Sequence, residues 1–320
     1  MNFLVTGGAG FIGSHVCERL LKAGHAVWTV DDLNPFYAPA IKQANLQAIQ
    51  TVPGRFEFIL GDITDATVVN AVFERTRFDQ VIHLAARAGV RPSLDAPALY
   101  QRVNVEGTVN VLEAARRTGV RKFIQASSSS VYGVNAKVPF SEGDSIFTAI
   151  SPYAASKLAC EALGHVYHHV YGLDVVALRF FTVYGPRQRP DLAIHKFARR
   201  MLAGKSIPVF GDGSTARDYT FVADIVDGIL ACTQHEFGFE IINLGDSNPI
   251  TLNRLIEVLE QTLGVQAQRD WMPAQPGDVP ITYANVEKAR RLLGYEPKVK
   301  IEAGIAKFVE WLRTQGVGKD

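Results

Sequence analysis

Cysteine is scarce in this sequence, and the few thiols it has are scattered. The 320 residues contain three cysteines, Cys17, Cys160 and Cys232, which lie far apart along the chain and form no metal-binding pattern. Spacing of this kind argues against a metal site. It predicts buried thiols in a reducing compartment.

An excess of charge of one sign and long hydrophobic runs are also missing. The 33 basic and 32 acidic residues leave a net charge of +1 at pH 7, so we expect no electrostatic attraction to nucleic acid or to an anionic membrane. No apolar run is long enough to cross a bilayer, and Met1 leads into Gly7 without a basic, cleavable leader. We therefore expect a cytoplasmic protein.

What the first 180 residues do contain is an alternation of short β-like runs and amphipathic helical stretches. We predict strands over residues 3–6, 26–30, 56–60, 80–84, 122–126 and 175–179, and helices that include 11–23 and 99–118. Gly24 and Gly119 close these two helices. The alternation predicts an α/β fold with a doubly wound parallel sheet of the Rossmann type.

After Gly185 the pattern changes to Pro/Gly-rich loops between short helices, which we expect over 192–203, 251–263, 286–293 and 301–313. A helix near 222–233 and a strand over 240–244 still resemble the first half. We therefore expect a first domain of residues 1–179, to which 218–245 return. A smaller, interleaved C-terminal domain would consist of 180–217 and 246–320.

A glycine-rich turn follows the first expected strand, in the sequence Gly7-Gly8-Ala9-Gly10-Phe11-Ile12-Gly13. Glycines there permit a tight turn and let the backbone approach a pyrophosphate at the start of the next helix. Eighteen residues after Gly13 come Asp31 and Asp32, where an acid can bind a ribose 2′-hydroxyl. No Arg or Lys follows until Lys42, which favours NAD over NADP. The alternative is a simple turn followed by two solvated carboxylates.

A second motif opens a helix expected over residues 152–171, with Ser151 as its N-cap and Gly172 at its end. Tyr153 and Lys157 are four residues apart and so share one face of its first turn. A free phenol has a pKa of ~10 and is a poor base at neutral pH, but a nearby ammonium lowers that pKa. The pair is a candidate proton shuttle. A surface Tyr and a solvated Lys are the alternative.

In their order along the chain, these motifs resemble the extended short-chain dehydrogenase/reductase family. The residues that carry the resemblance span essentially the whole chain and are Gly7–Gly13, Asp62-Ile63, His83-Leu84-Ala85-Ala86, Asn104, Ser127–Gly133 and Tyr153 with Lys157. The resemblance implies a seven-stranded parallel sheet carrying NAD and a smaller domain for a nucleotide sugar. It also implies a homodimer built through the two long helices.

The resemblance further implies individual site residues. Ser128 would join Tyr153 and Lys157 as the catalytic set, and the residues lining the NAD site would be Gly7, Gly10, Phe11, Ile12, Gly13, Asp31, Asp32, Asp62, Ile63, Leu84, Ala85, Ala86, Ala88, Asn104, Ser127, Tyr153, Lys157, Phe180 and Phe181. The run Ser127–Ser130 directly follows an expected strand, at the sheet edge where open α/β sheets bind ligands. A serine-rich turn that merely caps the strand is the alternative.

Within the family the chain resembles the nucleotide-sugar 4-epimerases, which are isomerases. The 4,6-dehydratases place an acidic residue beside the catalytic hydroxyl, and the decarboxylases carry Glu before Val-Tyr-Gly. Ser129 and Ser130 occupy those positions here, and neither acts as a general acid or base at neutral pH. The departure argues against both chemistries, because epimerisation needs only oxidation, rotation and reduction.

The stretch from residue 178 to 191 is the most informative about the sugar. UDP-galactose 4-epimerases usually carry Asn at the position of Thr182, whereas Thr182 with Arg189-Pro190-Asp191 resembles the UDP-glucuronate 4-epimerases. Arg189 would bind the C6 carboxylate by a two-point pair, assisted by the hydroxyls of Thr182, Ser129 and Ser130. The alternatives are a solvated loop charge or a diphosphate contact.

The resemblance places further substrate contacts in the second half of the chain. Val209 and Phe210 would lie on the uracil side, Arg217 and Tyr219 in the diphosphate clamp, and Asp278 at the uridine ribose. Gln275 stands where many glucose-type epimerases have Arg. We expect a UDP-glucuronate 4-epimerase. The alternatives are a UDP-glucose or UDP-N-acetylglucosamine 4-epimerase and, more distantly, a non-catalytic NAD-binding regulator.

Overall fold

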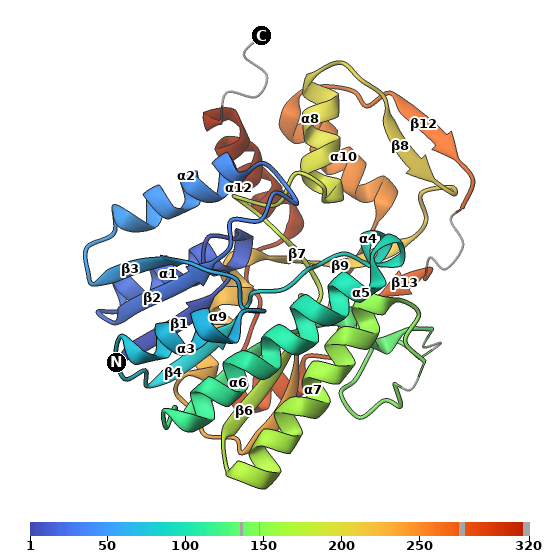
Figure 1. The fold of residues 1–320 in the computed structure, drawn as a ribbon. Helices are drawn as coiled ribbons and strands as arrows, with labels where there is room; N and C mark the ends of the chain where they lie inside the picture. Colours follow the sequence, from blue (N-terminus) through green and yellow to red (C-terminus); the bar gives the residue numbers. More distant parts are fainter. Residues whose placement is uncertain (135–136, 147, 275–278, 316–320) are drawn as a thin grey trace.

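A parallel seven-stranded sheet forms the centre of the molecule (Figure 1). The computed structural model describes residues 1–134, 137–146, 148–274 and 279–315. The sheet has the strand order β10-β6-β5-β4-β1-β2-β3. Its strands are β1 (Asn2–Thr6), β2 (Ala26–Asp31), β3 (Phe56–Leu60), β4 (Gln80–His83), β5 (Lys122–Ser128), β6 (Asp174–Phe180) and β10 (Phe239–Leu244). The predicted Rossmann-type α/β fold is confirmed.

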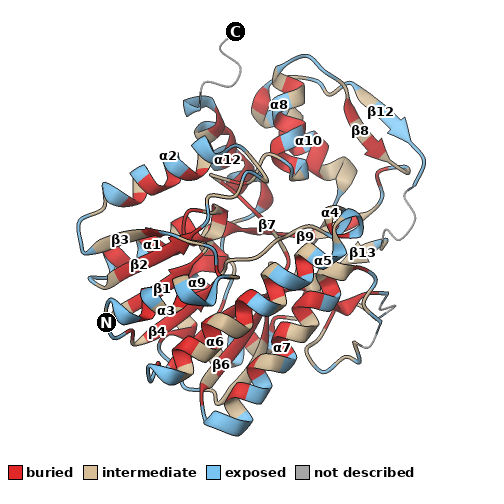
Figure 2. Ribbon diagram, in the orientation of Figure 1, coloured by how far each residue is buried: buried red, intermediate tan, exposed pale blue. Residues whose placement is uncertain are grey.

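Helices cover both faces of this sheet, because side chains alternate across each strand. Phe3 and Val5 of β1 belong to the core on the side of α1 (Phe11–Lys22) and α9 (Val222–Cys232). Leu4 belongs to the opposite core, with α3 (Ala66–Glu74), α6 (Gly107–Arg117) and α7 (Pro152–Tyr171). Figure 2 shows the buried sides of these helices turned toward the sheet and their exposed sides turned outward. Another helix, α2 (Pro39–Gln50), packs against α1.

The helix that carries Tyr153 begins and ends at the residues that the sequence predicts. Ser151 Oγ accepts a hydrogen bond of 3.1 Å from the backbone N–H of Ala154, and Pro152 is the first helical residue. Gly172 ends the helix in the left-handed conformation, with φ at 71°. Both termini are thus set by local chemistry.

The long helix predicted over 99–118 is not one continuous α-helix. It is divided into α5 (Pro97–Tyr100), a π-helical segment η1 (Gln101–Glu106) and α6. The widened segment contains Asn104, whose buried side chain bonds to neighbouring elements, and such π segments are frequent at functional sites. Figure 1 shows α6 and α7 side by side along one flank of the molecule.

The second half of the chain contains more strands than the sequence predicts. These are β7 (Thr182–Tyr184), β8 (Ile207–Phe210), β9 (Ala216–Phe221), β11 (Pro249–Thr251), β12 (Arg269–Met272) and β13 (Ile281–Thr282). Each has six residues or fewer, and β8 pairs with the distant β12. Local hydrophobic periodicity does not reveal such short, long-range pairs.

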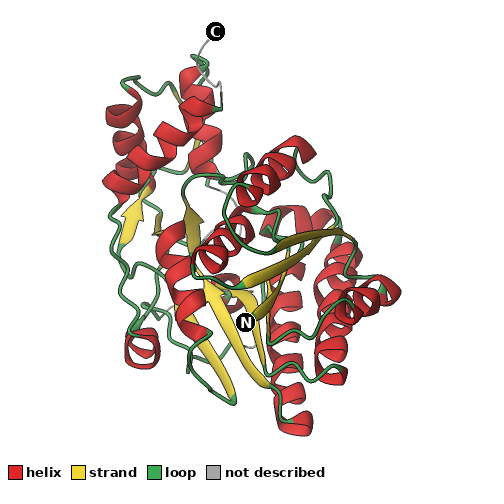
Figure 3. Ribbon diagram, turned by 90° about the vertical axis from the view of Figure 1, so that its left-hand side faces the viewer, coloured by secondary structure: helices red, strands yellow, loops and turns green. Residues whose placement is uncertain are grey.

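Helices accompany these short strands: α8 (Ala193–Leu202), α10 (Leu252–Leu263), α11 (Glu287–Leu293) and α12 (Ile301–Thr314). Figure 3 shows helices at the top of the molecule standing to one side of the yellow sheet. Between these elements the chain returns to the large sheet, because α9 packs on α1 and β10 pairs with β6. The two halves of the sequence are therefore interleaved in space.

The structure also shows the state of the cysteines and the character of the helices. No helix in the described ranges has both the length and the apolar character needed to cross a membrane. Cys17, Cys160 and Cys232 are free thiols and are all buried, as expected.

Candidate active site

The glycine turn lies where the strand order reverses, between β1 and β4, the place at which open α/β sheets bind ligands. Gly7 has φ at +74°, and a Cβ there would lie 2.7 Å from the backbone N of Ala85. A Cβ on Gly13 would lie 2.2 Å from the carbonyl oxygen of Gly7. Gly10 precedes α1 without a side-chain cap from the described residues. The first N–H groups of α1 are therefore available to an anion.

The acid expected to bind ribose comes with a buried lysine. Asp31 is buried at the end of β2, where its Oδ1 accepts hydrogen bonds from the Leu33 N–H at 2.9 Å and from Lys42 Nζ at 3.2 Å. Lys42 Nζ also lies 3.8 Å from Asp32 Oδ1. Burial raises the pKa of Asp31, and Lys42 opposes that rise. The spacing along the chain did not indicate this contact, because eleven residues separate Asp31 from Lys42.

The other residues expected around a dinucleotide gather at the same edge of the sheet. Those at the carboxyl ends of β1 to β4 are Gly7, Gly10, Phe11, Ile12, Gly13, Asp31, Asp32, Asp62, Ile63, Leu84, Ala85, Ala86 and Ala88. Those at the ends of β5 and β6 are Ser127, Phe180 and Phe181. The edge also holds two polar anchors, since Asp62 Oδ1 accepts from the Thr64 N–H and Thr6 Oγ1 accepts from the Ala85 N–H.

Asn104 lies at this edge, and its side chain forms hydrogen bonds with other residues of the protein. Its Oδ1 accepts from the Arg87 N–H at 2.7 Å, while its Nδ2 donates to the Arg87 carbonyl at 3.0 Å and to Ser156 Oγ at 2.9 Å. It is 1% exposed. These contacts make Asn104 a brace for the loop after β4 and for the first turns of α7.

The expected catalytic residues come from two neighbouring elements, β5 and α7. Lys157 is buried, and its Nζ donates to the Ala126 carbonyl of β5 at 2.8 Å. Ser128 ends β5, and its Oγ donates to Ser130 Oγ at 3.2 Å. The Tyr153 ring meets the Tyr100 ring edge-on, with the ring centres 6.2 Å apart. No hydrogen bond within the described ranges joins Tyr153 Oη to Ser128 or Lys157.

A buried ion pair links α7 to the sheet next to these residues. Glu161, one turn beyond Lys157, accepts from Arg179 Nε and Nη2 at 2.8 Å each and from Ser127 Oγ at 2.5 Å. The Arg179 guanidinium carbon also lies 4.8 Å from the centre of the Tyr132 ring. The pair therefore ties α7, β5 and β6 together beneath the site.

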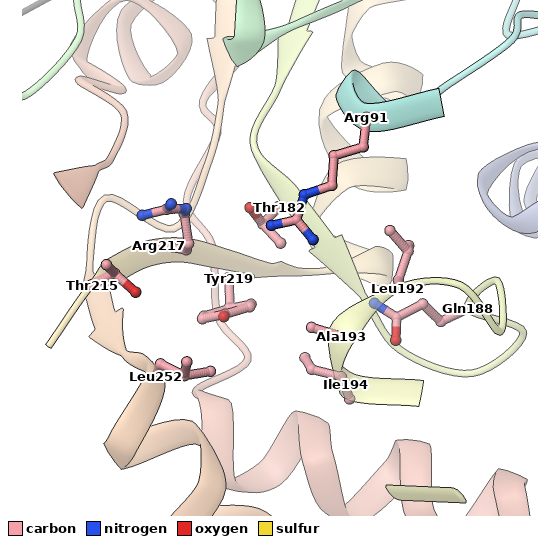
Figure 4. Close-up of a pocket in the computed structure, with 10 residues that line it drawn as sticks. All are labelled: Arg91, Thr182, Gln188, Leu192, Ala193, Ile194, Thr215, Arg217, Tyr219 and Leu252. Carbon is pink, nitrogen blue, oxygen red and sulfur yellow. The ribbon is translucent and has the colours of Figure 1, made fainter. Parts of the chain in front are cut away.

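Beside this edge lies a cavity of about 260 Å³. Figure 4 shows Arg91 of α4 (Val90–Asp95) reaching into it toward Thr182, with Arg217 and Tyr219 on the opposite side. Its full lining is Arg91, Thr182, Gln188, Leu192, Ala193, Ile194, Thr215, Arg217, Tyr219 and Leu252. Three of these residues, Thr182, Arg217 and Tyr219, are among the substrate contacts expected from the sequence. It missed Arg91, which lies just beyond the last recognised motif position, Ala88.

The expected uracil-side residues have different environments. Phe210 is half-buried, and the Arg91 guanidinium carbon lies 5.2 Å from the centre of its ring. Val209 is fully buried in the core, so its side chain has a packing role. Asp278 and Gln275 lie outside the described residues.

Arg189 is not among the residues that line the cavity. Its Nε and Nη2 donate to the two carboxylate oxygens of Asp191 at 3.0 and 2.8 Å, and its guanidinium carbon lies 5.4 Å from the centre of the Phe36 ring. Burial lowers the pKa of Arg189, but the interactions with Asp191 and with the charge of Tyr153 raise it by more. The pKa is therefore above its ordinary value. The two-point edge expected to bind substrate is thus already used by Asp191.

The remaining expected contacts, Ser129 and Ser130, lie half-buried in the short 3₁₀ helix η2 (Ser129–Tyr132) that follows β5. They are the first and second residues after Ser128 in the chain. Thr182, on β7, lies beyond the end of β6. The three hydroxyls are therefore carried by the segments that follow two adjacent strands of the sheet.

Comparison with known proteins agrees with this geometry. Residues 4–308 match the family described as GDP-mannose 4,6 dehydratase. A UDP-glucuronate 4-epimerase of Thermodesulfobacterium geofontis is 44% identical over 310 residues, which cover 97% of this chain and 95% of that protein.

Solved structures are similar over the same length. The crystal structure of UDP-glucuronic acid 4-epimerase from Bacillus cereus, in complex with UDP-glucuronic acid and NAD, has a TM-score of 0.92 at 36% identity and covers 98% of this chain and 100% of that one. The UDP-glucose 4-epimerase of Thermotoga maritima, with UDP-glucose, has a TM-score of 0.90 at 36% identity, covering 98% and 99%. The chain therefore belongs to the GDP-mannose 4,6 dehydratase family of extended short-chain dehydrogenases/reductases.

Proposed function

We propose that this protein is an NAD-dependent UDP-glucuronate 4-epimerase, which interconverts UDP-glucuronate and UDP-galacturonate through a 4-keto intermediate. The observation that carries this proposal is a cation, Arg189, which is held in place by Asp191 and is separate from the two cations that line the cavity. A UDP-sugar with a second anionic group needs such a cation. The Thermodesulfobacterium and Bacillus proteins described above carry this activity in their names.

The glycine turn fits a dinucleotide. A Cβ at Gly7 or Gly13 would collide with the backbone of Ala85 or Gly7, so glycine is needed for the tight turn, and the first N–H groups of α1 after Gly10 have no side-chain cap from the described residues. When bound, NAD⁺ supplies a hydride acceptor for C4 of the sugar and later returns the hydride to the opposite face. The chain's own residues at the ends of β1 to β6 bind and orient it. Asp31 and Asp32 lie where the adenosine ribose is expected.

Proton transfer is assigned to Tyr153. As a phenolate it accepts the proton of the sugar O4 hydroxyl, and it returns that proton when the 4-keto sugar is reduced. Lys157, fixed by the Ala126 carbonyl, places a positive charge one helical turn from Tyr153. Ser128 binds O4 through its hydroxyl and holds it in position.

The cavity suits the diphosphate of a UDP-sugar. Arg91 and Arg217 both line it, and two guanidinium groups pair well with phosphate oxygens. Anchored there, the 4-keto sugar can turn about its diphosphate and present its other face. Ser129 and Ser130 offer no acid or base, so neither dehydration nor decarboxylation is supported, although the family model is described as a dehydratase.

The carboxylate is assigned to the edge of Arg189 that Asp191 leaves free, together with the hydroxyls of Thr182, Ser129 and Ser130. Asp191 fixes the guanidinium in advance, so little ordering is needed when the substrate binds. In this arrangement Arg189 binds the carboxylate while the diphosphate remains in the cavity.

A UDP-glucose 4-epimerase is the second candidate. It is favoured by the pairing of Arg189 with Asp191, which already neutralises the cation. Turnover of UDP-glucuronate, UDP-galacturonate, UDP-glucose and UDP-N-acetylglucosamine, followed by product separation, tests both candidates. Inactivity on UDP-glucuronate, together with turnover of a UDP-sugar that has no carboxylate, would favour the second candidate function. A non-catalytic NAD-binding regulator would show no reduced-nicotinamide absorbance on addition of any of them.

We also propose that the protein is a cytoplasmic homodimer that pairs through α6 and α7. Val166 and Val170 on α7 are 46% and 59% exposed, and Tyr171 is 52% exposed. An apolar surface on a long helix is stabilised by contact with a second copy. The buried, free cysteines fit a reducing compartment. Sedimentation of wild type and Val170→Asp tests the dimer, which the added charge should weaken.

A further inference from the structure

The turn of residues 185–188, which follows β7, has a conformation that its own sequence does not favour. Arg187 has φ at +66°, and the N–H of Gln188 donates to the Gly185 carbonyl at 3.1 Å. With Pro186 in its second position, a turn closed in this way is of type II. The third position of a type II turn favours glycine, because a residue with a Cβ is strained at positive φ. An arginine in that position indicates that its side chain has a role.

Two contacts with α1 hold the turn in this conformation. Arg187 Nη2 donates to Glu18 Oε1 at 2.5 Å, and the two side chains are only 16% and 15% exposed. His15 Nε2 lies 3.0 Å from the Pro186 carbonyl oxygen, which can only accept, so Nε2 carries the proton. Burial lowers the pKa of His15 to about 4, so the ring is neutral at neutral pH. Local strain of this kind persists where the surrounding structure enforces it.

The chain that follows the turn forms one wall of the cavity. The residues of this wall are Gln188, Leu192, Ala193 and Ile194. Figure 4 shows them along the loop that leads into a helix, which is α8. The wall is braced within itself, because His195 Nδ1 lies 2.6 Å from the Gln188 carbonyl oxygen. A displacement of the turn would therefore move this wall relative to the opposite side of the cavity.

We propose that His15, Glu18 and Arg187 are positioning residues, which anchor the turn to α1 and thereby hold the cavity wall in the shape that binds a UDP diphosphate. The inference deepens the proposed function and rests on it, because that function assigns a UDP-sugar to this cavity. The three residues act through the backbone of the turn and not by contact with the ligand. The helix that follows the glycine turn then supports the substrate cavity as well.

Two substitutions of Arg187 separate anchoring from folding. Arg187→Gly and Arg187→Ala both remove the guanidinium, but glycine adopts positive φ without strain and alanine does not. Arg187→Gly should therefore unfold at a higher temperature than Arg187→Ala. Both variants lose the contact with Glu18, so their affinities for UDP should be equally reduced. If the side chain served only the stability of the fold, affinity would follow the unfolding temperature.

The experiment measures the dissociation constant of UDP by calorimetry in the presence of NAD⁺, together with KM and kcat for UDP-glucuronate. A lost hydrogen bond between charged groups should weaken UDP binding about tenfold in Glu18→Gln and in Arg187→Gly. KM should rise by a similar factor while kcat changes less than about twofold, because the diphosphate is bound alike in the ground and transition states.

Conservative variants and a control complete the set. Arg187→Lys keeps a cation opposite Glu18 and should remain within about threefold of wild type in UDP affinity. His15→Leu removes the donor to Pro186 and should weaken UDP binding, whereas His15→Gln keeps an N–H donor and should restore it. Arg19→Met is the matched control, because Arg19 also lies on α1 but pairs with an aspartate of α9, in an ion pair that is 45% and 47% exposed.

Wild-type UDP affinity in both Glu18→Gln and Arg187→Gly would overturn the inference and leave the proposed function intact. Affinities that follow the unfolding temperatures of Arg187→Gly and Arg187→Ala would do the same. Wild-type protein that binds UDP but turns over no UDP-sugar would overturn the proposed function alone, and wild-type protein that binds no UDP would overturn both. Circular dichroism verifies folding, and Glu18→Gln supplies the test if an Arg187 variant does not fold.

Discussion

Glu161 and Arg179 form a two-point ion pair inside the protein, with side-chain exposures of 5% and 1%. The carboxylate comes from α7, the helix that carries Tyr153 and Lys157, and the guanidinium comes from β6. Neither charge can be left alone at this depth without a large cost in desolvation. The relationship fixes the rotation of α7 and hence the faces on which Tyr153 and Lys157 lie.

Glu161→Gln should therefore destabilise the protein strongly. Removing one partner of a buried ion pair costs about 3–5 kcal/mol, because the other charge remains buried and uncompensated. The free energy of unfolding, measured with urea, gives the loss. Ser127→Ala is the matched control, because it removes one hydrogen bond to Glu161 but keeps the pair, at about 1 kcal/mol. Equal losses in the two variants would contradict a dominant role for the ion pair.

Tyr153→Phe should leave folding and NAD binding nearly intact, because only one hydroxyl is lost, and should remove the base. General acid–base groups contribute roughly 10²–10⁴-fold to turnover, so we expect a loss of at least about 10²-fold. Steady-state kinetics on UDP-glucuronate provides the measurement, with nucleotide binding as the control. A variant that kept a tenth of wild-type turnover would show that another group carries the proton.

Arg189→Ala should impair uronate use far more than neutral-sugar use. Losing one partner of a charge-assisted contact in a desolvated site costs ~2–4 kcal/mol, and a neutral sugar makes no such contact. Once C4 is oxidised, the C6 carboxylate lies β to a ketone, and a carboxylate held less firmly loses CO₂ more readily. Mass spectrometry should detect more of a decarboxylated 4-keto pentose. Unchanged activity on UDP-glucuronate would place the carboxylate elsewhere.

Asp191→Asn tests the role of Arg189 by changing its ion-pair partner. The change removes the negative charge that occupies Arg189 Nε and Nη2, so the guanidinium should attract the substrate carboxylate more strongly. We expect a lower KM for UDP-glucuronate and an unchanged KM for UDP-glucose. A higher KM for UDP-glucuronate would show that Asp191 acts mainly by orienting Arg189.

Asp246 should make stability depend on pH. Burial raises its pKa to about 6, Lys300 opposes the rise, and Asp218 adds to it. The folded state therefore holds this proton more tightly than the unfolded state, and the contribution of Asp246 to stability falls as pH rises from about 4 to about 6. Asp246→Asn cannot ionise and should gain stability relative to wild type over that range, with a constant difference above it. Urea unfolding at several pH values measures the difference, and one that did not change with pH would contradict the assignment.

Local signals in the sequence predicted most of the sheet and the helix that carries Tyr153. The bounds of α7 follow from Ser151, Pro152 and Gly172, which act on their immediate neighbours. The strands of the large sheet are apolar runs between turn residues, and all six predicted in the first half lie within two residues of the observed ends. Fold class therefore followed from periodicity.

The features that the sequence did not predict depend on contacts between distant segments. The π-helical segment arises where Asn104 bonds to Arg87 and Ser156, and no local pattern encodes those partners. Arg91 enters the cavity only because α4 lies opposite β9 (Figure 4). The contact between Lys42 and Asp31 crosses from a helix to a strand end. Side-chain partners of this kind are set by the assembled fold.

The return of the chain to the large sheet after β9 has a mechanical consequence. The polypeptide passes between the sheet and the smaller group of strands three times, after β6, after β9 and after β10. The two groups of strands cannot move apart about a single flexible hinge, because the chain connects them at three places and all three connections would have to bend together. Cleavage near residue 180 would place β6 and its neighbour β10 on different pieces, and the side of β6 that faces β10 would become an unpaired sheet edge.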